Sequence, residues 1–287
     1  MPTCFFVSDL HGRRDRYDKL FAAIERERPA AVFLGGDLLP HVMASLDSAA
    51  PLSHDFLDGY LIPGFAHVRR RLAAAYPRVF LILGNDDARV EEQAVQAAGA
   101  DGVWEYAHEQ RIPWGSWDVV GYAWVPPTPF RLKDWERYDV SRHLEPGCSA
   151  PEEGWHSVPV DARQIRFATI RQDLERLAEV TDPQRTVFLF HTPPYDTALD
   201  RAALDGKHVD HAPLDVHVGS IAVRRFIEQH QPLLTLHGHV HESARLTGRW
   251  RERIGRTHAF SAAHDGPELA LVRFDPAALD AATRELR

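Results

Sequence analysis

Short runs of apolar residues recur along the chain, and each run is followed at once by polar residues. The five clearest runs occupy residues 5–7, 31–34, 79–83, 186–190 and 233–236. Continuous apolar runs rich in Val, Ile and Phe are typical of strands that are buried on both faces. We therefore expect five strands in the interior, with both sides of their sheet covered.

Helical periodicity fills several of the intervals between these runs. Apolar residues recur every three or four positions in residues 14–28, 64–76, 163–180 and 219–230, which predicts amphipathic helices. Ser220 is suited to cap the last of them at its N-terminus. Strands that alternate with helices predict an α/β fold.

Further strands are predicted outside this alternation. Residues 116–122 alternate like a half-buried strand, residues 257–262 and 268–274 resemble two more strands, and a last helix is expected from Pro276. These segments suggest a second set of strands packed against the first.

A chain of 287 residues can form one large α/β domain or two small ones. The sequence contains no internal repeat, low-complexity linker or clear domain boundary, so we expect one domain over residues 1–287. Two long loops are expected at about 39–62 and 125–161. Loops of this length in a compact domain are usually functional or mobile.

Composition and charge narrow the possible functions. A hydrophobic content of 44% with 26% charged residues is typical of a soluble globular protein. A net charge of −8 argues against a broad nucleic-acid or membrane footprint, although bound cations could still attract an anionic substrate. No apolar window is long enough to span a membrane, and no signal peptide is recognisable. We therefore expect a cytoplasmic protein.

The cysteine and histidine counts direct attention to metal sites. Cys4 and Cys148 alone cannot build a disulfide framework or a cysteine-based zinc site. The chain has 17 histidines, which makes other metal sites worth examining.

Side chains with metal-binding chemistry follow each of the five strands. They are Asp9 and His11, then Asp37, then Asn85 with Asp86 and Asp87, then His191, and finally His239 and His241. Each cluster taken alone is most simply a polar turn. Together they supply oxygen and nitrogen donors that suit divalent ions such as Mn, Fe or Zn, and the carboxyl ends of strands are where α/β sheets bind ligands. We therefore predict a metal centre assembled from all five loops.

The order Asp-x-His-Gly, Gly-Asp, Gly-Asn-x-Asp, His and Gly-His-x-His resembles that of the calcineurin-like binuclear metallophosphoesterases. The resemblance spans residues 9 to 241 and implies a four-layer αββα sandwich, in which two mixed sheets are flanked by helices. It also implies how two divalent metals (Mn, Fe, Zn, Ni or Mg) are held. Asp9, His11 and His241 would bind the first, Asn85, His191 and His239 the second, and Asp37 would bridge both.

Such a centre would make the protein a hydrolase of phosphoric esters. Two cations polarise the phosphoryl oxygens and lower the pKa of a bridging water, which yields a hydroxide for in-line attack. We expect hydrolysis of phosphomonoesters or phosphodiesters, with a small-molecule diester or a nucleotide as the preferred substrate. Alternatives are a protein phosphatase or a nuclease of the same family, the latter disfavoured by the charge, or a non-catalytic interaction scaffold. The oligomeric state does not follow from the sequence.

One position departs from the family pattern. The family usually has His after the Asn, where it helps to protonate the leaving oxygen, but this chain has Asp86. A carboxyl group is a poor general acid at neutral pH unless burial or a second anion raises its pKa. Asp86 is therefore either the catalytic acid, with Asp87 as the coupled anion, or a residue that orients a neighbour. A loop histidine could replace it, and the candidates are His41, His54, His208, His211 and His217.

Six of the seven tryptophans lie between residues 104 and 155. They could form an aromatic wall that stacks on a nucleobase. Packing in the core is the simpler interpretation.

Overall fold

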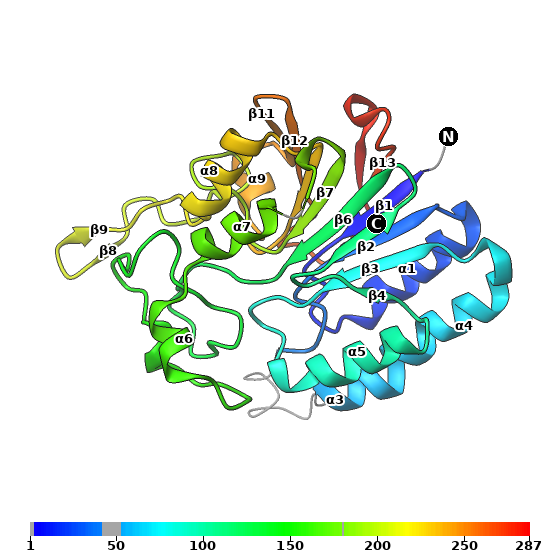
Figure 1. Cartoon of the computed structure of the whole chain (residues 1–287), viewed down its shortest axis with the longest axis horizontal. Helices are drawn as coiled ribbons and strands as arrows, with labels where there is room; N and C mark the ends of the chain where they lie inside the picture. The colour runs from blue at the N-terminus through cyan, green and yellow to red at the C-terminus, as the bar shows by residue number, and fades with distance from the viewer. Residues whose placement is uncertain (1–2, 42–52, 180) are drawn as a thin grey trace.

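The computed structural model describes residues 3–41, 53–179 and 181–287. Two six-stranded sheets lie face to face, with helices on both outer sides (Figure 1). The predicted four-layer sandwich of two mixed sheets is therefore confirmed.

The first sheet has the strand order β14 (Thr283–Leu286), β13 (Ala270–Phe274), β1 (Cys4–Val7), β2 (Ala31–Gly35), β3 (Arg78–Ile82) and β4 (Glu105–Tyr106). From β1 to β4 neighbouring strands are parallel, whereas β13 and β14 are antiparallel additions at one edge. Three of the predicted buried strands are β1, β2 and β3, and they lie side by side in the middle of this sheet.

The second sheet has the order β11 (Arg251–Ile254), β12 (Thr257–Ser261), β10 (Leu234–His237), β7 (Thr186–Phe190), β6 (Trp117–Tyr122) and β5 (Arg111–Trp114). Its four inner strands are parallel, and its two edge strands are antiparallel. A short hairpin of β8 (His208–Val209) and β9 (Ala212–Pro213) stands apart from both sheets (Figure 1).

Helices cover the two outer faces of the sandwich. The first sheet is covered by α1 (Arg14–Glu27), α3 (Ser53–Phe56), α4 (Ile62–Leu72) and α5 (Glu92–Ala100); α7 (Ile170–Glu179), α8 (Ile221–His230) and α9 (Ser243–Thr247) lie on the side of the second (Figure 1). Helix α6 (Ala162–Phe167) lies beyond the strand ends. As predicted, the Ser220 hydroxyl caps α8 by accepting a hydrogen bond from the N–H of Val223.

Aromatic side chains fill the space between the sheets. Trp114 of the second sheet packs edge-on against Phe33 and Phe80 of the first, and Phe260 meets Phe274 in the same way. Burial of such rings is the main source of stability in a core of this kind. These contacts hold the two sheets together and so fix the relative positions of the loops that follow their strands.

The five apolar runs do not form one set of strands. Strands β7 and β10 belong to the second sheet with β6 and β12, whereas the strand predicted at 268–274 joins the first sheet as β13. Three smaller details also differ from the prediction. The strand at Trp117–Tyr122 is almost completely buried rather than half-buried, because β5 and β7 flank it inside the second sheet. The segment 163–180 forms two helices, since the Thr169 hydroxyl accepts a hydrogen bond from the Gln172 N–H and starts a new helix.

The third difference is at the C-terminus. No helix begins at Pro276; a single helical turn at Leu279–Ala281 leads into β14. Pairing of β14 with β13 is strengthened by the ion pair between Arg273 and Glu285.

The long loops are only partly as expected. Within 39–62, residues 42–52 lie outside the described part of the chain, but the chain is helical from Ser53 onward. Residues 125–161 contain only a single short helical turn at Pro151–Glu153.

Candidate metal centre

Five loops converge at one edge of the two sheets. They follow the carboxyl ends of β1, β2, β3, β7 and β10. Each begins within a few residues of a buried strand, so the rigid core determines where its polar side chains lie.

The backbone of these loops is held in an unusual conformation. Asp9, His11, Asp37 and His239 all have positive φ, between 46° and 72°. This left-handed region is sparsely populated by residues other than glycine and clusters at functional sites. Hydrogen bonds from Asp9 N to Gly36 O, at 3.0 Å, and from His11 N to Asp37 O, at 2.9 Å, hold the first two loops together.

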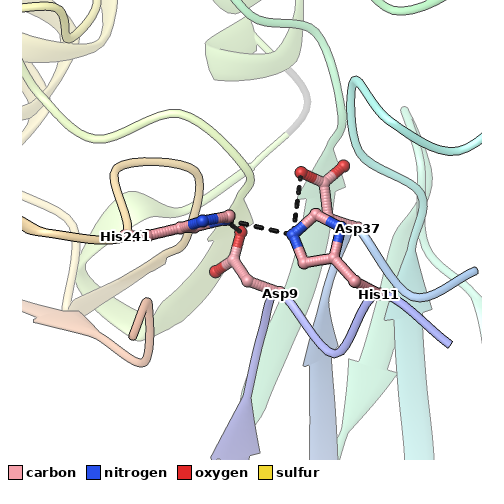
Figure 2. A group of neighbouring side chains, drawn as sticks. All are labelled: Asp9, His11, Asp37 and His241. Atoms are coloured by element: carbon pink, nitrogen blue, oxygen red, sulfur yellow. Dashed lines mark hydrogen bonds and ion pairs between the residues drawn. The ribbon is translucent and has the colours of Figure 1, made fainter. Parts of the chain in front are cut away.

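The first group of donors consists of Asp9, His11, Asp37 and His241, whose nearest ligand atoms lie within 4.8 Å of one another. Figure 2 shows these side chains pointing toward a common centre. His241 Nε2 is 3.1 Å from His11 Nε2 and 3.3 Å from Asp9 Oδ1. Four donor atoms within this radius can surround a single cation.

The second group consists of Asp37, His191 and His239. His191 Nε2 lies 3.3 Å from Asp37 Oδ2 and 3.0 Å from Asn85 Oδ1. The structure thus brings six of the seven predicted donors into two adjacent groups that share Asp37, and it places Asn85 beside His191.

Hydrogen bonds outside the two groups determine which donor atoms face inward. His191 Nδ1 donates to the carbonyl of Gly35 at 2.8 Å, and this contact turns Nε2 toward Asp37 and Asn85. The Asn85 amide nitrogen donates to Asp86 Oδ1 at 3.2 Å, which directs the Asn85 oxygen toward His191. Partners of this kind orient metal ligands in proteins.

One buried atom in the site lacks a hydrogen bond. Asp9 Oδ2 is fully buried and has no hydrogen-bond partner among the described residues. An unpaired carboxylate oxygen in the interior is costly, and a cation would compensate it. The donor set therefore fits divalent metal ions.

The donors of the two groups also interact strongly with one another. Burial opposes the charge of Asp9, but the hydrogen bond with His241 and the charges of His241 and His191 together outweigh burial and lower the pKa of Asp9 to about 2. Burial likewise opposes the protonation of His191 and His241, yet Asp37 raises the pKa of His191 to about 10 and Asp9 raises that of His241 to about 9. These shifts show that the carboxylates and the imidazoles of the site lie close enough to interact through their charges.

The two remaining carboxyl groups have different roles. Asp87 is fully buried and accepts hydrogen bonds from the N–H groups of Leu38, Leu39 and Gly84. It therefore ties the loop after β2 to the loop after β3. From the sequence we expect Asp87 only as an anion coupled to Asp86, because Leu38 and Leu39 lie almost 50 residues away along the chain.

Asp86 lies at the side of the first donor group. Its Oδ2 is 3.6 Å from His11 Nδ1, and its Oδ1 is 3.5 Å from His41 Nε2. Burial, followed by the charges of Asp37 and Asp87, raises the pKa of Asp86 to about 8. Bound cations would act in the opposite direction and favour the carboxylate.

Of the five loop histidines considered above, His41 is the one with a contact to Asp86. His54 pairs with Glu91, and His217 pairs with Asp200. His208 and His211 are exposed in or beside the β8–β9 hairpin.

Most of the tryptophans belong to the core. Trp104, Trp114, Trp124 and Trp135 are buried, and Trp155 is 46% exposed. Trp135 donates its ring N–H to the carbonyl of Asp87, so it supports the loop after β3 from behind. The four buried tryptophans therefore pack as core residues.

The sequence profile of the calcineurin-like phosphoesterases matches residues 3–243. The chain belongs to this family. As a calcineurin-like phosphoesterase it is a hydrolase that acts on phosphoric ester bonds, and its clustered Asp and His groups are able to bind metal.

Solved structures share the fold of this calcineurin-like phosphoesterase. One is 19% identical and aligns over 100% of this chain and 99% of that chain with a TM-score of 0.61. The protein TT1561 of Thermus thermophilus is 20% identical over 100% and 98% of the two chains, with a TM-score of 0.56. A dimetal phosphatase from Danio rerio is 15% identical over 95% and 91%, with a TM-score of 0.51.

No curated protein sequence matches the calcineurin-like phosphoesterase chain. In the described parts of the chain, no helix has both the length and the apolar character needed to cross a lipid bilayer.

Proposed function

We propose that this calcineurin-like phosphoesterase binds two divalent cations and hydrolyses a small-molecule phosphodiester or a nucleotide. Asp9, His11 and His241 hold one cation. Asn85, His191 and His239 hold the other, and Asp37 is shared.

One observation carries the proposal of a paired centre. Asp37 Oδ1 accepts a hydrogen bond from the N–H of Asp86 at 2.8 Å. Its Oδ2 lies 3.9 Å from His11 Nε2 in the first group and 3.3 Å from His191 Nε2 in the second. A carboxylate fixed in this way presents one oxygen to both groups, as a bridging ligand requires.

Paired cations polarise phosphoryl oxygens and lower the pKa of a water nucleophile. The chain's own residues hold the loops that carry the metal-binding side chains in position. The loops after β1 and β2 are held by backbone hydrogen bonds, and Asp87 fixes the loop after β3. The donor positions are therefore preorganised, which reduces the reorganisation needed during the reaction.

The leaving group needs a proton source, and the structure supports His41 in this role. Asp86, which stands where the family usually has His, lies within 3.5 Å of His41 Nε2. Next to two cations Asp86 would remain ionised, so it acts as an acceptor that holds His41 at the site and faces His11. Histidine is the side-chain type that exchanges protons most readily near neutral pH.

The preference for a small diester or nucleotide is supported by charge. A net charge of −8 does not favour the wide phosphate backbone of a nucleic acid. All seven donors are present, which favours catalysis over a scaffold that has lost its metal ligands.

The test is hydrolysis of bis(4-nitrophenyl) phosphate and 4-nitrophenyl phosphate by chelator-treated protein, before and after addition of Mn, Ni, Mg or Zn ions. We expect activity only with metal, and we expect Asp37→Asn to lose at least about a hundredfold in kcat/KM. Leu286→Trp, a change on an exposed edge strand, is the control and should behave like the wild type. Metal-independent hydrolysis, or an Asp37→Asn variant as active as the control, would refute the proposal.

A further inference from the structure

A separate cavity of about 290 Å³ lies between the long loop at 126–148 and the segment 195–221 that carries the β8–β9 hairpin. Its walls are mainly prolines and aliphatic side chains, among them Pro126, Pro129, Val140 and Leu214. The hairpin lies close to the loop at Gly147. A Cβ built on Gly147 would lie 3.1 Å from Val209 Cγ2 and 3.9 Å from Leu214 Cδ2. None of the seven proposed metal ligands lines this cavity.

The cavity is nevertheless close to the metal centre along the chain. Tyr195, which lines it, is only four residues after His191, and four extended residues span at most about 14 Å. The connection is rigid, since Tyr195 N donates to Ser220 O at 3.0 Å and Ser220 N donates to Pro193 O at 2.9 Å. The wall of the cavity at Tyr195 therefore lies within about the length of a nucleotide from His191.

Charge restricts what the cavity can hold. None of the described residues that line it is Lys or Arg, whereas Asp139, Glu145 and Asp215 are among them. A phosphate or another anion would be repelled, and an uncharged group bearing N–H donors would be favoured. The carboxyl group of Asp139 is already engaged by Ser220 and the N-terminus of α8. Asp215 accepts hydrogen bonds from the Tyr195 hydroxyl and the backbone N–H of His217, which leaves Glu145 as the carboxyl group available to a ligand.

Two rings give the cavity an aromatic side. Tyr195 and His217 lie 6.0 Å apart in an edge-to-face arrangement. Both are held in place, because Tyr195 donates its hydroxyl to Asp215 at 2.7 Å and His217 Nδ1 lies 2.8 Å from the buried Asp200. Fixed rings beside rigid prolines suit a flat partner, because little ordering entropy is lost on binding.

We propose that this cavity binds the heteroaromatic base of the substrate, a planar uncharged ring with amino or N–H donors, while its phosphate occupies the metal centre. The inference rests on the proposed function and specifies its substrate class. The volume is near the lower end of the range for small-molecule pockets, which fits a single ring system better than a polymer.

The experiment compares two diesters with the same leaving group and the same charge: the 4-nitrophenyl ester of adenosine 5′-monophosphate and methyl 4-nitrophenyl phosphate. With Mn²⁺ we expect the wild type to prefer the adenosine ester by about tenfold or more in kcat/KM, from the stacking of one base. Val140→Trp or Leu214→Trp, which fill the cavity, should remove this preference and leave the methyl ester within about twofold. Leu286→Trp is the matched control for an added tryptophan.

A wild type without preference for the adenosine ester, or a cavity variant that loses both activities equally, would overturn the inference. If neither diester is hydrolysed, the proposed function fails and the cavity is judged by calorimetric binding of free adenosine. Binding by the wild type and the control but not by Val140→Trp would support the cavity assignment. Absence of adenosine binding to the wild type at millimolar concentration would overturn it.

Discussion

Gly84 offers a way to disturb the proposed metal centre without changing any charge or ligand. A Cβ at this position would lie 2.3 Å from Asp37 Oδ1, 2.5 Å from Asp37 N and 2.7 Å from His191 Cε1. The backbone of Gly84 does not have positive φ, so an alanine could adopt this backbone conformation. The obstacle to alanine is the neighbouring atoms of Asp37 and His191. Gly84→Ala therefore tests how tightly the site is built.

The expected effect follows from these distances. Non-bonded heavy atoms prefer about 3.5 Å, so Asp37 would have to move by about 1 Å. Asp37 cannot move freely, because the crowded atoms include its backbone nitrogen and its Oδ1 is held by Asp86 N. Overpacking of this kind costs about 1–3 kcal/mol of stability. Metal–ligand distances tolerate only about 0.2 Å, so we expect at least a hundredfold loss of kcat/KM.

The assay combines rates, metal content and unfolding. Hydrolysis of bis(4-nitrophenyl) phosphate with Mn²⁺ gives the rate, metal analysis after gel filtration gives the occupancy, and urea denaturation gives the stability. Gly99→Ala is the control, because a Cβ there would have its nearest contact at 3.4 Å inside helix α5. That change should leave activity intact and add about 0.5–1 kcal/mol of stability.

The reasoning fails if Gly84→Ala retains two metals per chain and a rate within about threefold of the wild type. If the Gly99→Ala control loses as much stability as Gly84→Ala, the argument from crowding at Gly84 is also contradicted.

Three further predictions concern other parts of the molecule. If His41 protonates the leaving group and Asp86 holds it, His41→Ala and Asp86→Ala should both slow alkyl phosphodiesters at least about tenfold more than nitrophenyl esters; equal losses on both substrates would remove the two residues from that role. Arg273 donates two hydrogen bonds to Glu27 and lowers the pKa of Glu27 from 4.5 to about 2, so its stabilisation is complete above about pH 4.5 and is lost as the pH falls toward 2. Glu27→Gln should therefore cost about 1 kcal/mol at pH 7 and less at pH 3.5 in urea denaturation, and a difference that does not change with pH would contradict this. Lys133 and Glu136 form a fully buried pair at 2.6 Å, so Glu136→Leu should cost about 3–5 kcal/mol and Lys133→Met with Glu136→Leu should recover most of it; a double variant no more stable than the single one would refute this.

The sequence predicted the inner strands and the meeting of the donors because both depend on local patterns. The strands β1, β2, β3, β7 and β10 are mostly apolar, and a donor residue follows each of them within three residues. Parallel strands place the residues that follow them at one edge of a sheet. The sequence pattern therefore predicted that Asp9 and His241 lie close together, although more than two hundred residues separate them.

What the sequence could not predict depends on contacts between distant segments. The burial of β6 comes from its two neighbours in the sheet, and β14 exists because β13 offers an edge to pair with. The hydrogen bonds of Asp87 to Leu38 and Leu39, and the approach of His41 to Asp86, join separate loops. The cavity near Tyr195 lies between two irregular segments that have no periodicity to read.

The central claim is that two cations share Asp37, and electron paramagnetic resonance of the Mn²⁺-loaded protein tests it most directly. We predict two Mn²⁺ ions per chain with an exchange-coupled spectrum, and an uncoupled spectrum in Asp37→Asn. A single Mn²⁺ per wild-type chain with the six-line signal of an isolated ion would contradict the account.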